Sequence, residues 1–405
     1  MKTKFSRLAV LATVLSVTLI GCGQKTSSTP ADSMNVDTSP AATSPTTNPA
    51  PANPTPSVPD QPATSVPKPA DTAHHSYSVT ALDFANSNWG WVGGKGFILN
   101  TTNGGHDWNV QYDGPYEIDA FSFLNANTGW ALGHDGDGEV GGVVLQTKDG
   151  GLHWNEISHP AHVRNLHFVS ETTGFGSDMI TQDGGKTWTP VKAPDSLMGN
   201  PAFSDANHGW AVTAEGNSFQ IQHTADGGQT WTKLFSRPTQ EPPVTASVQT
   251  TSPVDAWVMI VGSSGMTQTS FSIFHTSDGG ANWQPVIAQS TAGGGTAPGY
   301  DTPNTGPKGP ASKPGYLEVV NSQVAMLSGF CGACGEGTIS TGWTVNNGKT
   351  WTNSTQQIPG SGGQLSFVNA NQGWLITSPY DKPSVLYNTQ TSGQTWTQEF
   401  VFGPK

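Results

Sequence analysis

One eight-residue pattern occurs seven times in this chain of 405 residues, and it limits the possible folds more than any other feature. Each copy fits T-x-[DNT]-[GNS]-G-x-x-W without gaps. A catalytic site occurs once in a chain, whereas a structural device can recur, and self-similarity at a fixed period is the signature of repeat architectures. We therefore interpret the pattern as framework, including TKDGGLHW, which contains an acid, a histidine and a tryptophan. The copies span 101–108, 147–154, 181–188, 224–231, 276–283, 344–351 and 389–396.

The residue types in the pattern suit a turn. Glycine at the fifth position allows a positive φ, and the acid or amide at the third position can accept hydrogen bonds from the turn's own N–H groups. Tryptophan at the eighth position supplies a large apolar body that packs the repeats together. His153 is not shared by the other copies, and we expect it to be an exposed turn residue. The third and eighth positions, which we predict to be structural, are Asn103, Trp108, Asp149, Trp154, Asp183, Trp188, Asp226, Trp231, Asp278, Trp283, Asn346, Trp351, Thr391 and Trp396.

A second motif precedes each copy, in the form of an aromatic or apolar residue, a polar turn, Gly-Trp and small residues. SFLNANTGWALG at 122–133 is a clear example, and 252–262 and 319–329 are weaker ones. Residues 77–402 give about 47 residues per unit, which is a usual size for a propeller blade. The eight-residue pattern resembles the Asp-box, or bacterial neuraminidase repeat, which lies between the third and fourth strands of a blade. The resemblance implies an all-β fold, a seven-bladed β-propeller over 77–405, with no sign of a blade shared between the termini.

The segment before the repeats has the features of an export signal and a tether. Basic residues precede a 13-residue apolar run, which is too short to span a membrane and ends in LIGC at Cys22. This end resembles the lipobox of bacterial lipoproteins and implies a signal peptide over 1–21, cleavage and lipidation of Cys22. We predict that 22–76, a Pro/Thr/Ser/Ala tract without aromatic residues, is a disordered linker. These features predict a protein of the bacterial cell envelope, lipid-anchored on the outer face of a membrane.

The charge of the chain excludes two classes of function. The formal net charge is −12, and only Arg164 and Arg237 remain as arginines once the leader is removed. A nucleic-acid-binding protein needs a basic face, which this chain cannot form. Sialidases, which share the Asp-box, use three arginines to hold the substrate carboxylate. Two arginines cannot form that site, so we do not expect sialidase activity.

The two motifs together resemble the photosystem II stability/assembly factor family, whose blades have the form F-x-[DN]-x-x-x-G-W followed by T-x-D-G-G-x-T-W. The resemblance covers 77–402. It implies a single seven-bladed propeller that is not an enzyme and that holds a partner protein. Photosynthetic members use an arginine-rich surface, which this chain lacks, so we expect a different, unknown envelope protein as partner. A carbohydrate-binding or glycoside-hydrolysing surface protein is the alternative, with a glycan as ligand.

The resemblance implies that the long insertions lie on the face opposite the Asp-box turns. Functional residues concentrate in loops that a rigid frame holds in place, so we predict that this face binds the ligand. The insertion at 289–315 has low complexity and is expected to be disordered. The candidate binding residues on this face are His134, His159, His162, Arg164, Tyr116, Arg237, Tyr300 and Tyr380.

Two shorter motifs have chemical interpretations. Cys331 and Cys334 form CGAC, for which a structural disulfide is the default outside the cytosol, with a redox pair or a metal site as alternatives. The DGDGE stretch places Asp135, Asp137 and Glu139 at alternate positions, as in the first half of a calcium loop, but lacks the later ligands. We predict no other cofactor.

Overall fold

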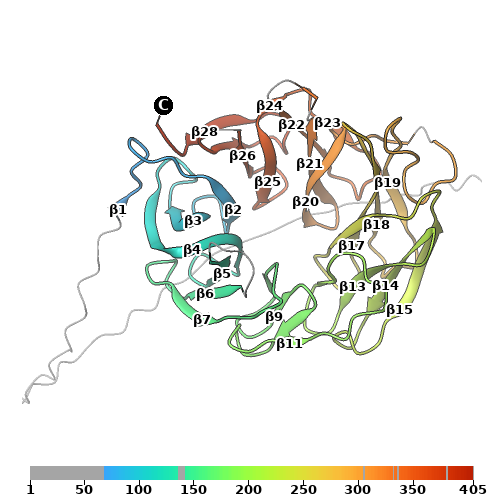
Figure 1. Cartoon of the computed structure of the whole chain (residues 1–405), viewed down its shortest axis with the longest axis horizontal. Helices are drawn as coiled ribbons and strands as arrows, with labels where there is room; N and C mark the ends of the chain where they lie inside the picture. Colours follow the sequence, from blue (N-terminus) through green and yellow to red (C-terminus); the bar gives the residue numbers. More distant parts are fainter. Residues whose placement is uncertain are drawn as a thin grey trace, which may run out of the picture. The chain divides into compact units, whose positions relative to one another are not determined.

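The computed structural model describes residues 68–135, 142–303, 306–331, 333–334, 337–379 and 382–404. The predicted signal peptide, Cys22 and most of the predicted linker lie outside the described residues. The described part consists of strands, turns and loops without a helix, and it contains no helix that could cross a membrane. Its strands form antiparallel sheets that stand around a common centre (Figure 1). The fold is therefore an all-β propeller, as the repeats predict.

The described strands pair into six sheets, each built from strands that follow one another in the chain. The first sheet contains β1 (Lys68–Pro69), β2 (Val79–Phe84), β3 (Gly90–Thr101), β4 (Asn109–Phe123), β5 (Gly129–His134), β6 (Val143–Thr147) and β7 (Asn155–Ser158). The second contains β8 (His167–Phe168), β9 (Gly174–Gly176), β10 (Met179–Thr181) and β11 (Thr189–Pro190), and the third β12 (Ala202–Phe203), β13 (Gly209–Ala214), β14 (Ser218–Thr224) and β15 (Thr232–Pro238). The fourth contains β16 (Thr245–Gln249), β17 (Ala256–Ser264), β18 (Thr269–Thr276) and β19 (Gln284–Gln289). The fifth contains β20 (Lys313–Asn321), β21 (Val324–Cys331), β22 (Thr338–Thr344), β23 (Thr352–Asn353) and β24 (Ile358–Pro359), and the sixth β25 (Ser361–Phe367), β26 (Gly373–Ser378), β27 (Val385–Thr389) and β28 (Thr397–Val401).

The first sheet is larger than the others because β4 is long. The first part of β4 pairs with β3, with Tyr112 opposite Ile98, and its second part pairs with β5, with Phe121 opposite Ala131. The same strand therefore ends one repeat and begins the next. This explains why the seven copies of the turn motif are distributed over six sheets.

Aromatic side chains fill the seams between neighbouring repeats. The aromatic residue that follows the glycine of the second motif stacks on the aromatic residue at the start of the same motif in the next repeat. The stacked pairs have nearly parallel rings, and such contacts add to the free energy gained by burying the rings. The pairs are Trp91 with Phe123, Trp130 with Phe168, Phe175 with Phe203 and Trp374 with Phe84, with ring centroids 3.6, 3.7, 4.1 and 3.6 Å apart.

The ring is closed by contacts between the last and first repeats. Trp374 stacks on Phe84 across this seam and donates a hydrogen bond from Nε1 to the Gly104 carbonyl at 2.9 Å. The Tyr77 N–H donates to the Phe402 carbonyl at 2.7 Å. All strands of the sixth sheet come from the C-terminal repeat. The described termini therefore do not share a sheet, as the sequence predicts.

The folded part begins earlier than residue 77, the boundary that the sequence predicts. Lys68 pairs with Val110, and the Ala70 N–H donates to the Trp108 carbonyl at 2.9 Å. Ala70 also packs against the buried cluster that contains Trp108. Proline is tolerated at a sheet edge, where its missing N–H does not break a ladder. The end of the expected linker thus covers the outer edge of the first repeat.

The insertion at 289–315 is largely packed against the propeller, although its composition predicts disorder. Ala297 is buried, and the Gly309 N–H donates to the Gln289 side chain at 2.8 Å. Gly309 lies so close to Phe271 that a Cβ atom at this position would come 2.4 Å from the ring. Glycine and proline here permit close packing on an aromatic ring, which composition alone does not reveal.

Candidate functional site

The Asp-box turns are held by one repeated set of hydrogen bonds. In the second copy, Thr147 Oγ1 accepts from the Gly151 N–H at 2.7 Å, and Asp149 Oδ1 accepts from the His153 N–H at 3.0 Å. Equivalent bonds occur in the other six copies. Seven turns with the same internal bonding form a framework.

The seventh position of the turn is chemically matched to the third. His153 Nδ1 lies 2.6 Å from Asp149 Oδ2. At the same place in two other turns, the Thr187 hydroxyl donates to Asp183 and the Thr230 hydroxyl donates to Asp226. These two hydroxyl donors lower the pKa of Asp183 and of Asp226 to about 2. Where the third residue is an amide donor, Asn103, the seventh is an acceptor, Asp107, at 2.9 Å. His153 is therefore an exposed turn residue with a structural partner.

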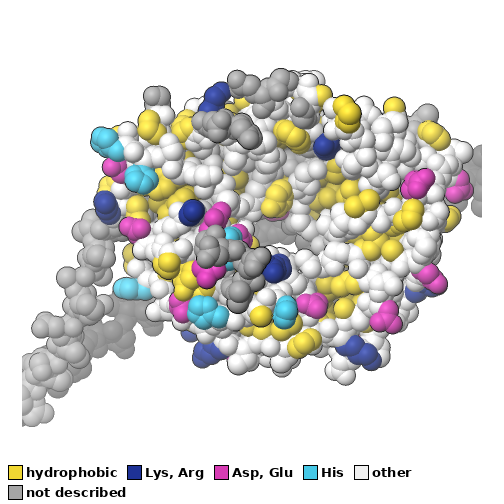
Figure 2. Space-filling model, in the orientation of Figure 1, with side chains coloured by type: hydrophobic (Ala, Val, Ile, Leu, Met, Phe, Trp, Pro, Cys, Tyr) yellow, Lys and Arg dark blue, Asp and Glu magenta, His cyan; other side chains and the backbone are white. Residues whose placement is uncertain are grey.

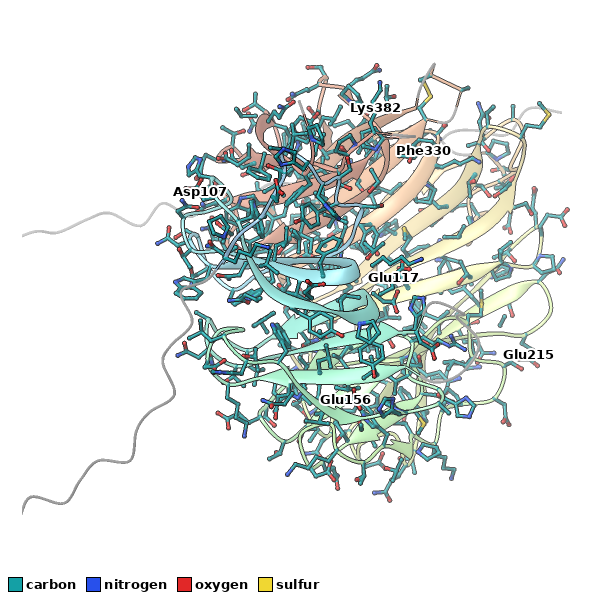
Figure 3. The ribbon with its side chains drawn as sticks, turned by 60° about the vertical axis from the view of Figure 1, so that its left-hand side comes forward. Asp107, Glu117, Glu156, Glu215, Phe330 and Lys382 are labelled. Carbon is teal, nitrogen blue, oxygen red and sulfur yellow. A yellow bond between two sulfur atoms is a disulfide. The ribbon has the colours of Figure 1, made fainter. Side chains whose placement is uncertain are left out.

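The Asp-box turns and the long loops lie on opposite sides of the propeller. Figure 3 places Asp107, in a turn of the first repeat, and Glu215, in the loop between β13 and β14, on opposite sides of the molecule. We call the side with the loops the looped face. It carries the β13–β14 and β17–β18 loops, the described parts of the β5–β6 and β21–β22 loops, and the connections between repeats.

A three-residue cluster on the second repeat combines two of the predicted binding residues. The Tyr116 hydroxyl donates to Glu156 Oε2 at 2.8 Å, and His159 Nε2 lies 2.6 Å from Glu156 Oε1. The hydrogen bond to Glu156 raises the pKa of Tyr116 to about 12, and the same bond, followed by that to His159, lowers the pKa of Glu156. Each oxygen of the carboxylate is therefore engaged by a neighbouring side chain.

Other predicted residues of this region lie on the looped face without forming a site. His134 Nδ1 lies 2.7 Å from Asp119 Oδ2, and acidic and histidine side chains gather over β4–β7 in Figure 2. His162 and Arg164 are exposed in the connection after β7. Asp137 and Glu139 of the weak calcium motif lie outside the described residues, whereas Asp135 lies within them. No group of three or more potential metal ligands occurs in the described ranges.

Arg237 and Tyr300 are brought together, but in a structural role. The Arg237 guanidinium carbon lies 5.5 to 5.7 Å from the ring centroids of Phe235, Phe274 and Tyr300. Its Nη1 donates to the Gly299 carbonyl at 3.3 Å. A guanidinium over aromatic faces is stabilised by cation–π attraction. Arg237 therefore attaches the insertion after β19 to the propeller. Tyr380 lies outside the described residues.

Cys331 and Cys334 are joined by a disulfide in the loop that follows β21. The Gly337 N–H donates to the Cys334 carbonyl at 3.2 Å, so the bridge lies in a chain of tight turns. A disulfide that closes so short a loop stabilises the fold by about 2 kcal/mol at most in the chain-entropy description. The bridge shapes this loop on the looped face.

A polar cavity of about 810 Å³ lies along the central channel. It is lined by the innermost strands β8, β12, β16 and β20, and the molecule is hollowed near its centre in Figure 2. Two of these strands, β8 and β12, have only two residues each. Among the described residues that line it, His167 and Glu318 are the only ionisable ones.

The channel wall contains a ring of contacts that the sequence analysis missed. In each repeat, one residue directly precedes the aromatic or apolar residue that begins the second motif, as Ser122 precedes Phe123. This residue faces the channel, and we call these seven positions the capping positions. In five repeats, the side chain at the capping position accepts a hydrogen bond from the backbone N–H of the first motif residue in the next repeat. His167 instead contacts the backbone of Phe203, and Ala202 has no polar side chain. The five acceptors are Asp83 to Phe123, Ser122 to Phe168, Gln249 to Val319, Glu318 to Phe367 and Ser366 to Phe84.

Two of these acceptors are partly buried carboxyl groups. Burial raises the pKa of Glu318 to about 8, with a further increase from the negative charge of Asp83. Burial also raises the pKa of Asp83 to about 6. The capping positions escaped notice because their residue types differ: aspartate, serine, histidine, alanine, glutamine, glutamate and serine. Their constant place in the repeat is the signal that could have revealed them.

Comparison with known proteins gives one sequence relative of limited coverage. No protein-family model matches the chain. The photosystem II assembly protein Ycf48 of Synechococcus sp. (strain JA-2-3B'a(2-13)) is 28% identical over 104 residues, which cover 24% of this chain and 31% of that protein. The chain is a propeller similar to Ycf48. The matched region spans less than a third of the length of this relative.

Solved structures share the fold. A structure described as YCF48 bound to D1 peptide covers 82% of this chain and 99% of its own, at 19% identity and a TM-score of 0.49. The GH74 xyloglucanase from Xanthomonas campestris covers 81% of this chain and 54% of its own, at 13% identity and a TM-score of 0.51. At these identities the likeness concerns the propeller fold alone.

Proposed function

We propose that this chain is a lipid-anchored, non-catalytic propeller of the bacterial envelope that binds a protein partner through its looped face and the adjoining channel. The Asp-box side consists of seven turns with the same internal bonds. The opposite side carries the insertions and differs from repeat to repeat. This asymmetry is the observation that supports the proposal, because variable loops on a rigid frame are where binding residues concentrate. The likeness to Ycf48, which is named as an assembly protein, agrees with it.

We infer seven blades for this propeller. The first sheet accounts for two of them, since β4 ends one repeat and begins the next. Each of the other five sheets contains one copy of the turn motif. Three seams of stacked aromatic rings join neighbouring repeats, and a fourth joins the last repeat to the first.

The carboxyl groups of the site support binding rather than hydrolysis. Hydrolysis of a glycosidic bond needs one protonated and one ionised carboxyl group on either side of the bond. Glu156 is engaged by Tyr116 and His159. Asp83 and Glu318 each accept a backbone N–H of the next repeat, which gives them a structural role. A glycan ligand remains the alternative outcome of the experiment below.

Affinity capture tests the proposed function. Residues 68–405 are immobilised and exposed to solubilised envelope of the native organism, beside the looped-face variant Tyr116→Ala/His159→Ala and the Asp-box-side control Lys148→Ala. We expect one envelope protein to be retained by the wild type and the control and lost by the looped-face variant. Retention of polysaccharide without protein would contradict the proposal and favour the glycan alternative.

Membrane attachment is a separate part of the proposal and is tested on the full chain. We expect labelled palmitate to be incorporated into the wild type and not into a Cys22→Ala variant. A wild-type protein that is exported without incorporating the label would contradict lipidation while leaving the partner-binding proposal unaffected.

A further inference from the structure

One of the seven capping positions has no side-chain atom that can accept a hydrogen bond. Ala202 is the residue at this position in the third sheet, and its methyl group offers no acceptor to the next repeat. The N–H that it would serve is that of Thr250, directly after β16. In the part of the chain that the structure describes, no hydrogen bond is made to this N–H. A backbone donor without a protein partner must bond to water or to a ligand, because an N–H that has neither loses about as much free energy as a broken hydrogen bond.

The next repeat shows what fits this position. The side-chain amide of Gln249 bridges two backbone groups on the channel edge of β20. Its Oε1 accepts from the Val319 N–H at 3.0 Å, and its Nε2 donates to the Leu317 carbonyl. One amide group therefore satisfies both a donor and an acceptor on the free edge of an innermost strand.

The register of the strands identifies the corresponding pair on β16. Gln249 lies opposite Trp257 in the pairing of β16 with β17, as Glu318 lies opposite Met326 in the pairing of β20 with β21. Thr250 therefore corresponds to Val319. By the same register Val248 corresponds to Leu317, so that its carbonyl faces the channel.

These free groups lie where the cavity is. Ala202, Val248 and Thr250 all line the 810 Å³ space, which is within the size range of cavities that enclose a small ligand. The described lining contains no lysine or arginine, and its one carboxyl group, Glu318, has its pKa raised by burial. The surroundings therefore favour an uncharged hydrogen-bonding group over a carboxylate.

We propose that the cavity binds an amide group of an extended peptide segment, which accepts from Thr250 N–H and donates to the Val248 carbonyl in place of the missing side chain at position 202. Gly199 already lies against the Ala246 carbonyl on this edge, so the peptide would extend the edge of β16 at Val248 and Thr250, as peptides do when they add a strand to a sheet. This inference rests on the proposed function in that the partner is a protein. It adds the place of binding and the chemical group that is recognised.

The first test follows the Thr250 amide by nuclear magnetic resonance in protein labelled with 15N-threonine. The probe is the blocked peptide acetyl-tetraalanine-amide, added up to tens of millimolar, beside an analogue with N-methylated peptide bonds. We expect a saturable shift of the Thr250 signal with the peptide and at least tenfold weaker binding of the analogue. Absence of a saturable shift, or equal binding of the analogue, would overturn the proposal.

Two substitutions supply the missing cap and its control. Ala202→Gln introduces the amide that Gln249 provides one repeat further on, whereas Ala202→Met has a similar size without an amide. We expect hydrogen exchange of the Thr250 N–H to be slowed at least tenfold in A202Q and not in A202M, and A202Q to lose the response to the peptide. Equal exchange in both variants would show that position 202 does not face this N–H.

The opposite substitution opens a second site. Gln249→Ala frees the Val319 N–H and the Leu317 carbonyl, so we expect the Val319 amide to respond to the peptide in this variant. If this variant does not fold, the A202Q and A202M pair still decides the question.

The capture experiment separates this inference from the proposed function. A partner retained equally by the wild type and by A202Q would refute the amide site while leaving the proposed function intact. Failure of the wild type to retain any protein would refute the proposed function, and the response of Thr250 to the peptide would still stand as a separate result.

Discussion

The carboxyl group of Glu318 makes a strong prediction about how stability depends on pH. Its pKa is raised from 4.5 to about 8 because the partly buried group loses hydration in the channel wall and is repelled by the charge of Asp83. In the unfolded chain the carboxyl group titrates near its ordinary value. Between these two pH values the unfolded state loses the proton and the folded state keeps it, so the free energy of unfolding falls as the pH rises. The stability contributed by the protonated form is fully present below about pH 4.5 and lost by about pH 8.

The magnitude follows from the size of the shift. Each pKa unit corresponds to about 1.4 kcal/mol, so the full shift sets an upper limit of about 5 kcal/mol. The side chain lines a channel that solvent reaches, and Asp83 shares part of the effect, so we expect about 2–3 kcal/mol from Glu318. Glu318→Gln removes the titration and preserves the cap, because Gln249 shows that glutamine can cap at the equivalent place.

Urea denaturation followed by tryptophan fluorescence at pH 5 and pH 8.5 measures this effect. We expect E318Q to match the wild type at pH 5 and to exceed its stability by about 2–3 kcal/mol at pH 8.5. Glu171→Gln, on an exposed turn, is the control and should follow the wild type at both pH values. Parallel pH dependence of the wild type and E318Q would refute the assignment of a buried, protonated carboxyl group to this position.

Three further predictions concern the framework. Trp374→Ala removes the stack on Phe84 at the closing seam and should cost about 3–5 kcal/mol of unfolding free energy in urea, whereas the exposed control Leu152→Ala should cost less than about 0.5; equal costs would contradict a role in closure. Asp183→Ala should lower the free energy of unfolding by about 1–2 kcal/mol, and Asp183→Asn by much less, because asparagine already occupies this position in two other Asp-box turns. An equal loss in both variants would show that the charge of the carboxylate is required. Arg237→Met should accelerate cleavage within 289–303 by a protease that does not cut at arginine or lysine. Unchanged cleavage would mean that the guanidinium does not anchor this segment.

The framework could be predicted from the sequence because it repeats. Seven copies of one turn fix the fold class, since a structural device has the same residues wherever it occurs. The match between the third and seventh positions of the turn was less visible. Asp149 with His153 and Asn103 with Asp107 look unrelated as letters, but each pair places one donor against one acceptor.

The insertion after β19 shows where composition misleads. A stretch rich in glycine and proline resembles a chain that cannot bury a core. In the structure, the lack of a side chain on Gly309 allows its backbone to lie on Phe271. Arg237, which packs among aromatic rings, donates a hydrogen bond to the Gly299 carbonyl. The surface that receives the segment is formed by residues distant in sequence, so no local pattern announces the contact.

The capping positions were missed for the opposite reason. Their function is constant and their residue types are not, because a serine, a carboxyl group or an amide can each accept the same N–H. The gap at Ala202 becomes meaningful only after the six other positions are seen to reach the next repeat. Arg237, one of the candidate binding residues, also contributes to the framework through its contacts with aromatic rings.

The closing seam resembles the seams within the chain, so the repeats form a continuous ring. The seam between the last and first repeats uses the same ring stacking as seams within the chain, and Tyr77 lies within hydrogen-bonding distance of Phe402. No strand crosses this seam, so the position of the chain termini does not determine how the ring is held together. A circular permutant joined at these neighbouring ends and opened between two other repeats, except the first and second, which share β4, would keep every sheet whole. If the chain is lipid-anchored as proposed, such a protein would carry its tether on another side of the ring and present a different part of the looped face to the membrane.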